Sequence, residues 1–164
     1  MPHPPVIDGF EFARCNSRLA GSRRGDSLPR LRECLYAPDG TVDFEIEGVP
    51  EMQGRPALRL QVSAKLALQC QRCLGRVDVE LSSKAVLLLY DDEAELAAHR
   101  VEVEGPEHVL AGREMQVLDL VEDEVLLAIP QAPRHGQCRT HDGDARGAPQ
   151  RPFAGLRALM GGKR

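Results

Sequence analysis

The chain has 164 residues, of which 42% are hydrophobic and 28% charged, and its formal net charge is −4; these values are typical of a soluble globular protein with a single domain. Tryptophan is absent and aromatic residues make up only 4%, so we expect a core of leucine, valine and alanine. No apolar run approaches the roughly 18 residues of a membrane span and the first residues carry no secretory pattern, so we expect a cytoplasmic protein rather than a membrane or exported one.

Charge is unevenly distributed along the chain. Six arginines lie between Arg14 and Arg32 against one acid, and residues 90–124 contain twelve acids against two arginines. Residues 134–164 then contain seven basic residues against two acids. Basic segments of this kind can contact the phosphates of a nucleic acid even when the total charge is acidic. The alternative interpretation is that they are simply solvated surfaces.

The N-terminal region is expected to be helical. Phe12, Cys15 and Leu19 recur at helical spacing within residues 8–20. The following GSRRGDS stretch has the composition of a loop, and LPRLRECL of a short turn or helix. We interpret Cys15 and Cys34 as core residues.

Three stretches alternate apolar and polar residues, as half-buried strands do. They lie near residues 42–48, 57–70 and 76–90. The second is the strongest periodic signal in the chain, with seven apolar residues from Leu58 to Cys70 on one face. Because only a short Cys/Gly segment separates the second and third stretches, they predict an antiparallel hairpin.

A helix is predicted at 116–129, with Leu118, Val121 and Val125 as its apolar stripe. Its polar face is assigned to Asp119, Glu122 and Asp123, and Pro130 ends it. We interpret Asp119 and Asp123 as solvated residues rather than as a magnesium site.

The predicted fold is α+β: an antiparallel β-sheet or hairpin core packed by this C-terminal amphipathic helix and the N-terminal helix. Residues 1–138 are expected to form a single domain. Residues 139–164 are expected to be a basic, mostly flexible tail with a short amphipathic segment. Binding of RNA or a protein partner is assigned in this tail to Arg151, Phe153, Leu156, Arg157, Lys163 and Arg164. Docking of Phe153 and Leu156 on the chain's own domain is the alternative.

Two pairs of residues have the spacing of metal ligands. Cys70 and Cys73 form a C-x2-C motif at the predicted hairpin turn, and His135 and Cys138 are again separated by two residues. Three thiols and an imidazole suit tetrahedral Zn²⁺, which would tie the segment after the helix to the hairpin as a zinc knuckle. Such a closed site is structural rather than catalytic. His141 is an alternative to His135 as the fourth ligand.

Enzyme signatures are not found. The sequence has no phosphate-binding loop, dinucleotide fingerprint, HExxH or GxSxG motif. The enzymatic alternative is a thiol-disulfide oxidoreductase using Cys70 and Cys73, but redox C-x2-C motifs open a helix, whereas this one lies in a predicted hairpin. The low aromatic content disfavours an RNA-recognition sheet that stacks bases. His99 and His108 are expected to be solvated.

Several of these stretches together resemble the YceD family of large ribosomal RNA accumulation proteins. They are CQRCL after a strand, LVEDEVLLAIPQAPRHGQC, RPFAGLRAL near the basic C-terminus, and FARCNSRLAG and LPRL near the start. The resemblance covers nearly the whole chain. It maps the family's cysteine motif onto Cys70 and Cys73 and its post-helix segment onto His135 and Cys138, where many relatives carry more cysteines.

The resemblance implies a cytoplasmic, non-enzymatic factor in ribosome biogenesis. Such a factor would support 23S rRNA synthesis, processing or stability during large-subunit assembly. Its partners would be 23S rRNA, a large-subunit precursor or ribosomal proteins, with no membrane and no small-molecule substrate. A protein-binding adaptor that makes no RNA contact is the alternative.

Overall fold

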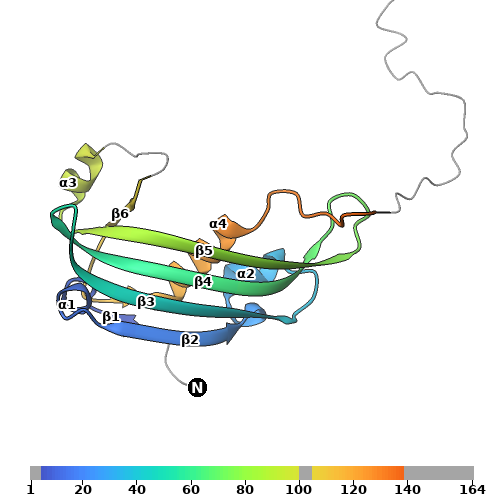
Figure 1. Ribbon diagram of the computed structural model, residues 1–164, viewed down its shortest axis with the longest axis horizontal. Coiled ribbons are helices and arrows are strands. Elements are labelled where there is room, and N and C mark those ends of the chain that lie inside the picture. The colour runs from blue at the N-terminus through green and yellow to red at the C-terminus, as the bar shows by residue number, and fades with distance from the viewer. Residues whose placement is uncertain (1–4, 100–104, 139–164) are drawn as a thin grey trace, which may run out of the picture.

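The computed structural model describes residues 5–99 and 105–138. In that part of the chain five strands form one sheet in the order β2-β3-β4-β5-β6 (Figure 1). Neighbouring strands are antiparallel, except that β6 runs parallel to β5. The strands are β2 (Arg18–Arg24), β3 (Gly40–Met52), β4 (Arg55–Gln69), β5 (Arg76–Tyr90) and β6 (Glu107–Leu110).

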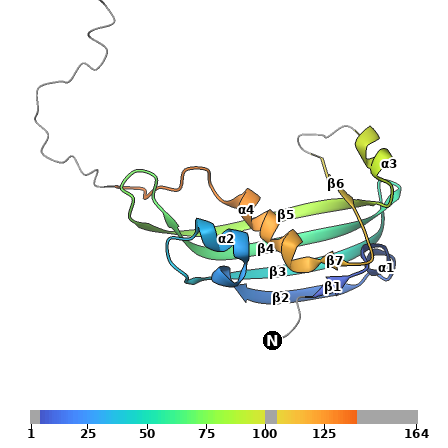
Figure 2. The same cartoon turned by 180° about the vertical axis from the view of Figure 1, so that it is seen from behind.

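Three helices, α1 (Gly9–Arg14), α2 (Pro29–Cys34) and α4 (Val117–Ala128), cover one face of the sheet (Figure 2). The main core lies between the two layers, where Leu58 and Val62 of β4 share one buried cluster with Val121 and Val125 of α4. Leucine, valine and alanine supply most of its side chains. The predicted α+β fold, with an antiparallel core packed by a C-terminal amphipathic helix and an N-terminal helix, is confirmed.

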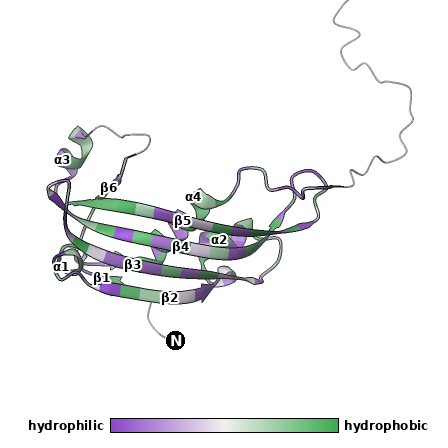
Figure 3. Ribbon diagram, in the orientation of Figure 1, coloured by the Kyte–Doolittle hydropathy of each residue, from purple (hydrophilic) through white to green (hydrophobic). Residues whose placement is uncertain are grey.

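Strands β3, β4 and β5 form a long antiparallel meander and correspond to the three predicted strands. The β3–β4 hairpin turns through Gln53 and Gly54, whose φ angles of 53° and 81° match the type I′ turn that suits the twist of paired strands. Hydropathy alternates along much of the meander but is uniformly apolar at the end of β5 (Figure 3). Residues 87–90 are all buried there, because both faces of the sheet are covered.

Helix α3 (Glu93–Ala98) lies at the end of the sheet where β5 ends (Figure 1). Its Leu96 packs against a second, smaller buried cluster that includes Leu88 and Tyr90. The guanidinium of Arg55 lies 4.0 Å from the centroid of the Tyr90 ring and pairs with Glu95 of α3. This helix is therefore held to the sheet by the Arg55–Glu95 ion pair as well as by the apolar burial of Leu96.

The N-terminal region differs from the prediction. The helix ends at Arg14, Asn16 takes a left-handed φ of 50°, and edge strand β2 runs through the stretch predicted to be a loop. Strand β2 has a weak apolar alternation because one of its inward positions is Gly21, which is paired with Phe44 of β3. The Phe44 ring fills the space beside this glycine, and a Cβ at position 21 would lie 2.9 Å from it.

The interpretation of Cys15 and Cys34 as core residues is wrong. Both are exposed. Cys15 forms the C-terminal cap of α1, and Cys34 is the last residue of α2. Each thus lies where its helix leaves the sheet, outside the stripe that the helix buries.

A two-stranded sheet fixes the start of α4. It pairs β1 (Val6–Ile7) with β7 (Met115–Gln116), and the amide of Val117 donates to the carbonyl of Pro5 at 3.1 Å. The first residue of α4 is thereby anchored to the N-terminal segment. No helix in the described part of the chain is long and apolar enough to cross a membrane.

Glu122 of α4 is buried rather than on the polar face to which the sequence pattern assigned it. One carboxylate oxygen accepts hydrogen bonds from the amides of Arg30 and Leu31, at 2.7 and 2.9 Å. The other accepts from Nε of Arg30 at 3.1 Å. Glu122 therefore caps the first turn of α2 from a different helix, which satisfies two orphan amides and complements the helix dipole.

Strand β6 brings Glu107 onto the helix-covered face, beside acids of α4. Its partner in the register is Leu87, a core residue. Burial, followed by the charges of Glu124 and Asp123, raises the pKa of Glu107. Because the pKa of Glu107 is higher in the folded state, the folded chain prefers the protonated carboxyl. The stability that this group contributes is therefore present below its unfolded pKa and lost as the pH rises through its folded pKa. Ionised Glu107 therefore opposes docking of β6 at pH 7.

Glu107→Gln is expected to raise the free energy of unfolding at pH 7 by less than about 1 kcal/mol, since the group is largely exposed and screened. The gain should disappear near pH 4, where the glutamate itself becomes protonated. Urea denaturation at both pH values measures this, with exposed Glu114→Gln as the control. A glutamine variant less stable than wild type at pH 7 would contradict the assignment.

Candidate metal centre

Four potential metal ligands from two distant segments meet at one end of the sheet. Cys70 and Cys73 belong to the β4–β5 turn, here called the knuckle (residues 70–75). His135 and Cys138 belong to the stretch after α4, here called the post-helix segment (residues 129–138). One ligand atom from each of the four residues lies within 4.8 Å of all the others. In Figure 1 the post-helix segment leaves α4 and runs to the knuckle.

The distances between ligand atoms fit a single four-coordinate ion. Sγ of Cys70 lies 3.4 Å from Sγ of Cys138, and Nδ1 of His135 lies 3.4 and 3.6 Å from Sγ of Cys73 and Cys138. A tetrahedral ion about 2.3 Å from sulfur and about 2.0 Å from nitrogen separates its ligands by about 3.5–3.8 Å. The four residues therefore lie close enough to bind a metal with little rearrangement.

Backbone hydrogen bonds shape the knuckle and join it to the post-helix segment. The amide of Cys70 donates to the carbonyl of Gly75 at 2.8 Å, and that of Leu74 donates to the carbonyl of Cys70 at 2.9 Å. The amide of Gln71 reaches across to the carbonyl of Pro133 at 2.9 Å. The two segments are thus in direct contact, independently of any ion.

The second nitrogen of His135 is fixed as well. Nε2 lies 2.7 Å from the carbonyl oxygen of Arg76, an acceptor, so Nε2 carries the proton and Nδ1 presents its lone pair toward the sulfurs. A metal-binding histidine is commonly oriented by such a bond. The Arg76 guanidinium also pairs with Asp39 and Asp78, at 2.7 and 2.8 Å.

The surroundings favour a thiolate at Cys70. Burial acts to raise the pKa of this thiol, but hydrogen bonds from the amides of Cys73, Arg72 and His135, together with the Cys138 thiol, bring it to about 5. At Cys138, burial and hydrogen bonding with the neighbouring cysteines raise the pKa. One sulfur is therefore ready to ligate at neutral pH, while Cys138 must lose its proton when a cation binds.

The other candidate residues do not join this cluster. The carboxylate of Asp123 forms an ion pair with the guanidinium of Arg30, with Oδ1 and Nη1 2.5 Å apart. His108 is not merely solvated, because its Nδ1 lies 2.9 Å from the Tyr90 hydroxyl oxygen, and His99 packs edge-on against the same tyrosine ring. The alternative ligand His141 lies outside the described residues. So do the tail residues assigned to partner binding: Arg151, Phe153, Leu156, Arg157, Lys163 and Arg164.

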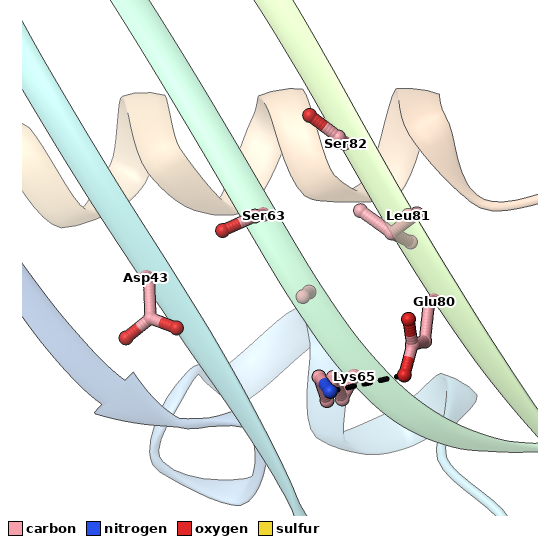
Figure 4. A pocket seen from close by; sticks show the side chains of 7 residues that line it. Asp43, Ser63, Lys65, Glu80, Leu81 and Ser82 are labelled. Carbon is pink, nitrogen blue, oxygen red and sulfur yellow. Dashed lines mark ion pairs between the residues drawn. The ribbon is translucent and has the colours of Figure 1, made fainter.

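A shallow polar hollow on the helix-free face of the sheet is the next candidate. Ser63, Lys65 and Ser82 line it, and the ion pair between Lys65 and Glu80, 3.0 Å long, lies at one side (Figure 4). Among the described residues, neither serine has a hydrogen bond to a basic side chain, so this part of the chain offers no activated nucleophile in the hollow. The metal centre is thus the stronger candidate site.

Sequence reasoning missed the groups that orient the ligands. They are the carbonyls of Pro133 and Arg76, and backbone atoms leave no residue-type signal.

The comparison with known families gives a match: the family model described as "Large ribosomal RNA subunit accumulation protein YceD" matches residues 58–160. This stretch is well over half of the chain and contains all four clustered residues. No solved structure matches the chain.

Proposed function

Because the chain belongs to the YceD family of large ribosomal RNA subunit accumulation proteins, we propose that it is a non-enzymatic, cytoplasmic factor in ribosome biogenesis. It supports the synthesis, processing or stability of 23S rRNA during large-subunit assembly. Its contacts are 23S rRNA, the precursor particle or its proteins. The family match, which spans the β4–β5 hairpin, α4 and the metal centre as one unit, is the observation that carries this proposal.

The ion proposed for Cys70, Cys73, His135 and Cys138 is Zn²⁺, because three thiols and an imidazole form a donor set that zinc prefers. All four tetrahedral positions are then filled by the protein, so no position remains for a substrate or an activated water. Zinc acts structurally here: it holds the post-helix segment, and with it the start of the basic tail, against the hairpin.

The thiol-disulfide alternative has less support. A redox pair exchanges between its own two cysteines, yet Sγ of Cys70 lies in hydrogen-bonding contact with Sγ of Cys138, at 3.4 Å. Cys70 is also buried and follows an antiparallel strand instead of opening a helix. The lowered pKa of Cys70 suits a metal ligand equally well.

The tail is proposed to contact RNA through its basic residues. Phosphate contacts make binding fall with salt, because each one releases condensed counterions. Reversing the charges of Arg151, Arg157, Lys163 and Arg164 is expected to abolish co-sedimentation with large-subunit precursors on sucrose gradients. The matched control reverses four exposed cations without ion pairs in the described part of the chain: Arg14, Arg32, Lys84 and Arg113.

The wild-type chain should also bind a protein-free 23S rRNA fragment, more weakly as salt increases. Co-sedimentation without binding to protein-free RNA would instead favour the protein-binding adaptor. If the tail variant and the control lose co-sedimentation with the precursors to the same extent, a role for the tail is contradicted. Failure of the wild-type chain to co-sediment at all would overturn the proposed function.

A further inference from the structure

The outer tip of the knuckle carries three exposed side chains that the fold does not use. They are Arg72 and Leu74 of the knuckle and Arg134 of the post-helix segment, here called the knuckle tip. We infer that the knuckle tip is a contact surface for single-stranded RNA. This inference rests on the proposed function and adds a binding site on the folded domain, separate from the tail.

Leu74 has a backbone conformation that its side chain makes unfavourable. Three non-glycine residues in the described chain have positive φ: Asn16, Gln53 and Leu74. Asn16 follows a helix end and Gln53 lies in a type I′ turn, where such angles are expected. Leu74, at φ 58°, is the only branched apolar residue of the three.

The side chain of Leu74 gains little from its own domain in return. It is 63% exposed, so the strain is not offset by burial. Glycine or asparagine would fit this backbone with less strain. A strained position that presents an apolar side chain to solvent is the kind of feature that binding surfaces retain.

The two arginines of the tip extend from adjoining backbone. The hydrogen bond from the Gln71 amide to the Pro133 carbonyl, 2.9 Å long, joins the backbone next to Arg72 and Arg134, the following residue in each segment. Both are exposed and neither forms an ion pair within the described residues, although nearby Arg76 pairs with Asp39 and Asp78.

These arginines also set the sign of the local charge. Three thiolates and one divalent cation leave the metal centre with a negative formal charge. A knuckle without Arg72 and Arg134 would therefore repel phosphate. The backbone hydrogen bond between Gln71 and Pro133 brings the two segments together, although 61 residues separate Arg72 from Arg134 in the sequence.

Single-stranded RNA fits this combination best. Guanidinium groups bind phosphates and stack on bases, and an exposed apolar side chain packs on the face of an unstacked base. Duplex RNA offers mainly phosphates and hydroxyls, which leave Leu74 without a partner. An acidic protein segment would satisfy the arginines, and the test below separates that case.

The test measures binding of the full chain, loaded with zinc, to a fluorescein-labelled single-stranded RNA of about 16 nucleotides, the upper end of the range of single-strand site sizes. Leu74→Gly is expected to weaken binding about fivefold, while zinc content and the thermal midpoint stay at or above the wild-type values. Leu74→Asn, which places another residue that tolerates positive φ at this position, should weaken binding in the same way.

The double variant Arg72→Gln with Arg134→Gln should weaken binding on the order of tenfold and reduce the slope of log Kd against log salt by about 1.4.

The charge-matched control is Lys84→Gln with Arg113→Gln, two exposed cations without ion pairs in the described chain; it should leave the slope nearly unchanged. If the tip variants bind RNA as the control does while wild type binds, the inference fails and the proposed function stands. If they bind RNA normally but no longer co-sediment with precursors, the tip contacts a protein and the RNA inference is again overturned. If wild type binds no RNA, direct RNA contact itself is wrong.

Discussion

Cys73→Ser is expected to release the post-helix segment from the knuckle while the five-stranded sheet stays folded. Serine is a poor zinc ligand, and losing one of four ligands should lower zinc affinity at least a hundredfold. At free zinc near a hundred times the wild-type Kd, zinc stabilises the wild type by about 2.7 kcal/mol, and a hundredfold loss of affinity removes about 2.3 kcal/mol of this. The effect should be local, because most of the core lies between the sheet and its helices, and the metal centre adds only Cys70, with Cys73 and Cys138 packed against it.

Hydrogen exchange measures this outcome residue by residue. The amides of Gln71 and Leu74, which are bonded to Pro133 and Cys70, should lose protection, while amides in the centre of β4 keep it. Cys34→Ser is the matched control, since Cys34 is exposed and outside the cluster. Protection at Gln71 that survives both Cys73→Ser and zinc chelation would show that the knuckle needs no metal.

Glu122→Ala is expected to lower the free energy of unfolding by about 3 kcal/mol. The carboxylate is 3% exposed and is the acceptor for two backbone amides at the start of α2. Its removal leaves those donors without a partner and also deprives Arg30 of its more buried ion pair. Urea denaturation measures the change.

Two further variants separate the parts of this effect. Asp123→Ala removes the exposed partner of the same arginine and should cost less than about 1 kcal/mol. Glu122→Gln keeps an acceptor for the amides and should fall between the two. If Glu122→Ala costs no more than Asp123→Ala, capping of α2 by Glu122 does not stabilise the fold.

Local patterns predicted the elements whose signal lies in consecutive residues. The alternation from Leu58 to Cys70 predicted β4 because every inward side chain of that strand is apolar. Strand β2 escaped prediction because Gly21 and Arg23 occupy inward positions of an edge strand. The stretch forms a strand because it pairs with β3, and not because its own side chains are hydrophobic.

Long-range pairing explains most of the remaining differences. Glu122 follows the polar pattern of its helix, yet it is buried because the amides of Arg30 and Leu31 and the guanidinium of Arg30, 92 and 91 residues earlier, donate hydrogen bonds to it. The basic stretch from Arg14 to Arg32 suggested phosphate contacts, but Arg18 and Arg30 are engaged with the distant acids Glu47 and Glu122. No local pattern contains these two partners.

The candidate site was more predictable than the rest of the fold because metal ligands are recognised by residue type and spacing. C-x2-C and H-x2-C identified four residues, and the hairpin placed the first pair at a turn. The sequence could not choose between His135 and His141. In the structure it is His135 whose Nδ1 lies against the sulfurs, oriented by the Arg76 carbonyl.

X-ray absorption at the zinc edge of the purified full chain tests most directly whether two distant pairs of residues share one ion. We expect one equivalent of zinc, with three sulfur neighbours at about 2.3 Å and one nitrogen at about 2.0 Å. His135→Ala should replace that nitrogen by a light atom from solvent and keep the three sulfurs. A wild-type spectrum with only two sulfurs, or a chain purified in zinc-containing medium without zinc, would contradict the account.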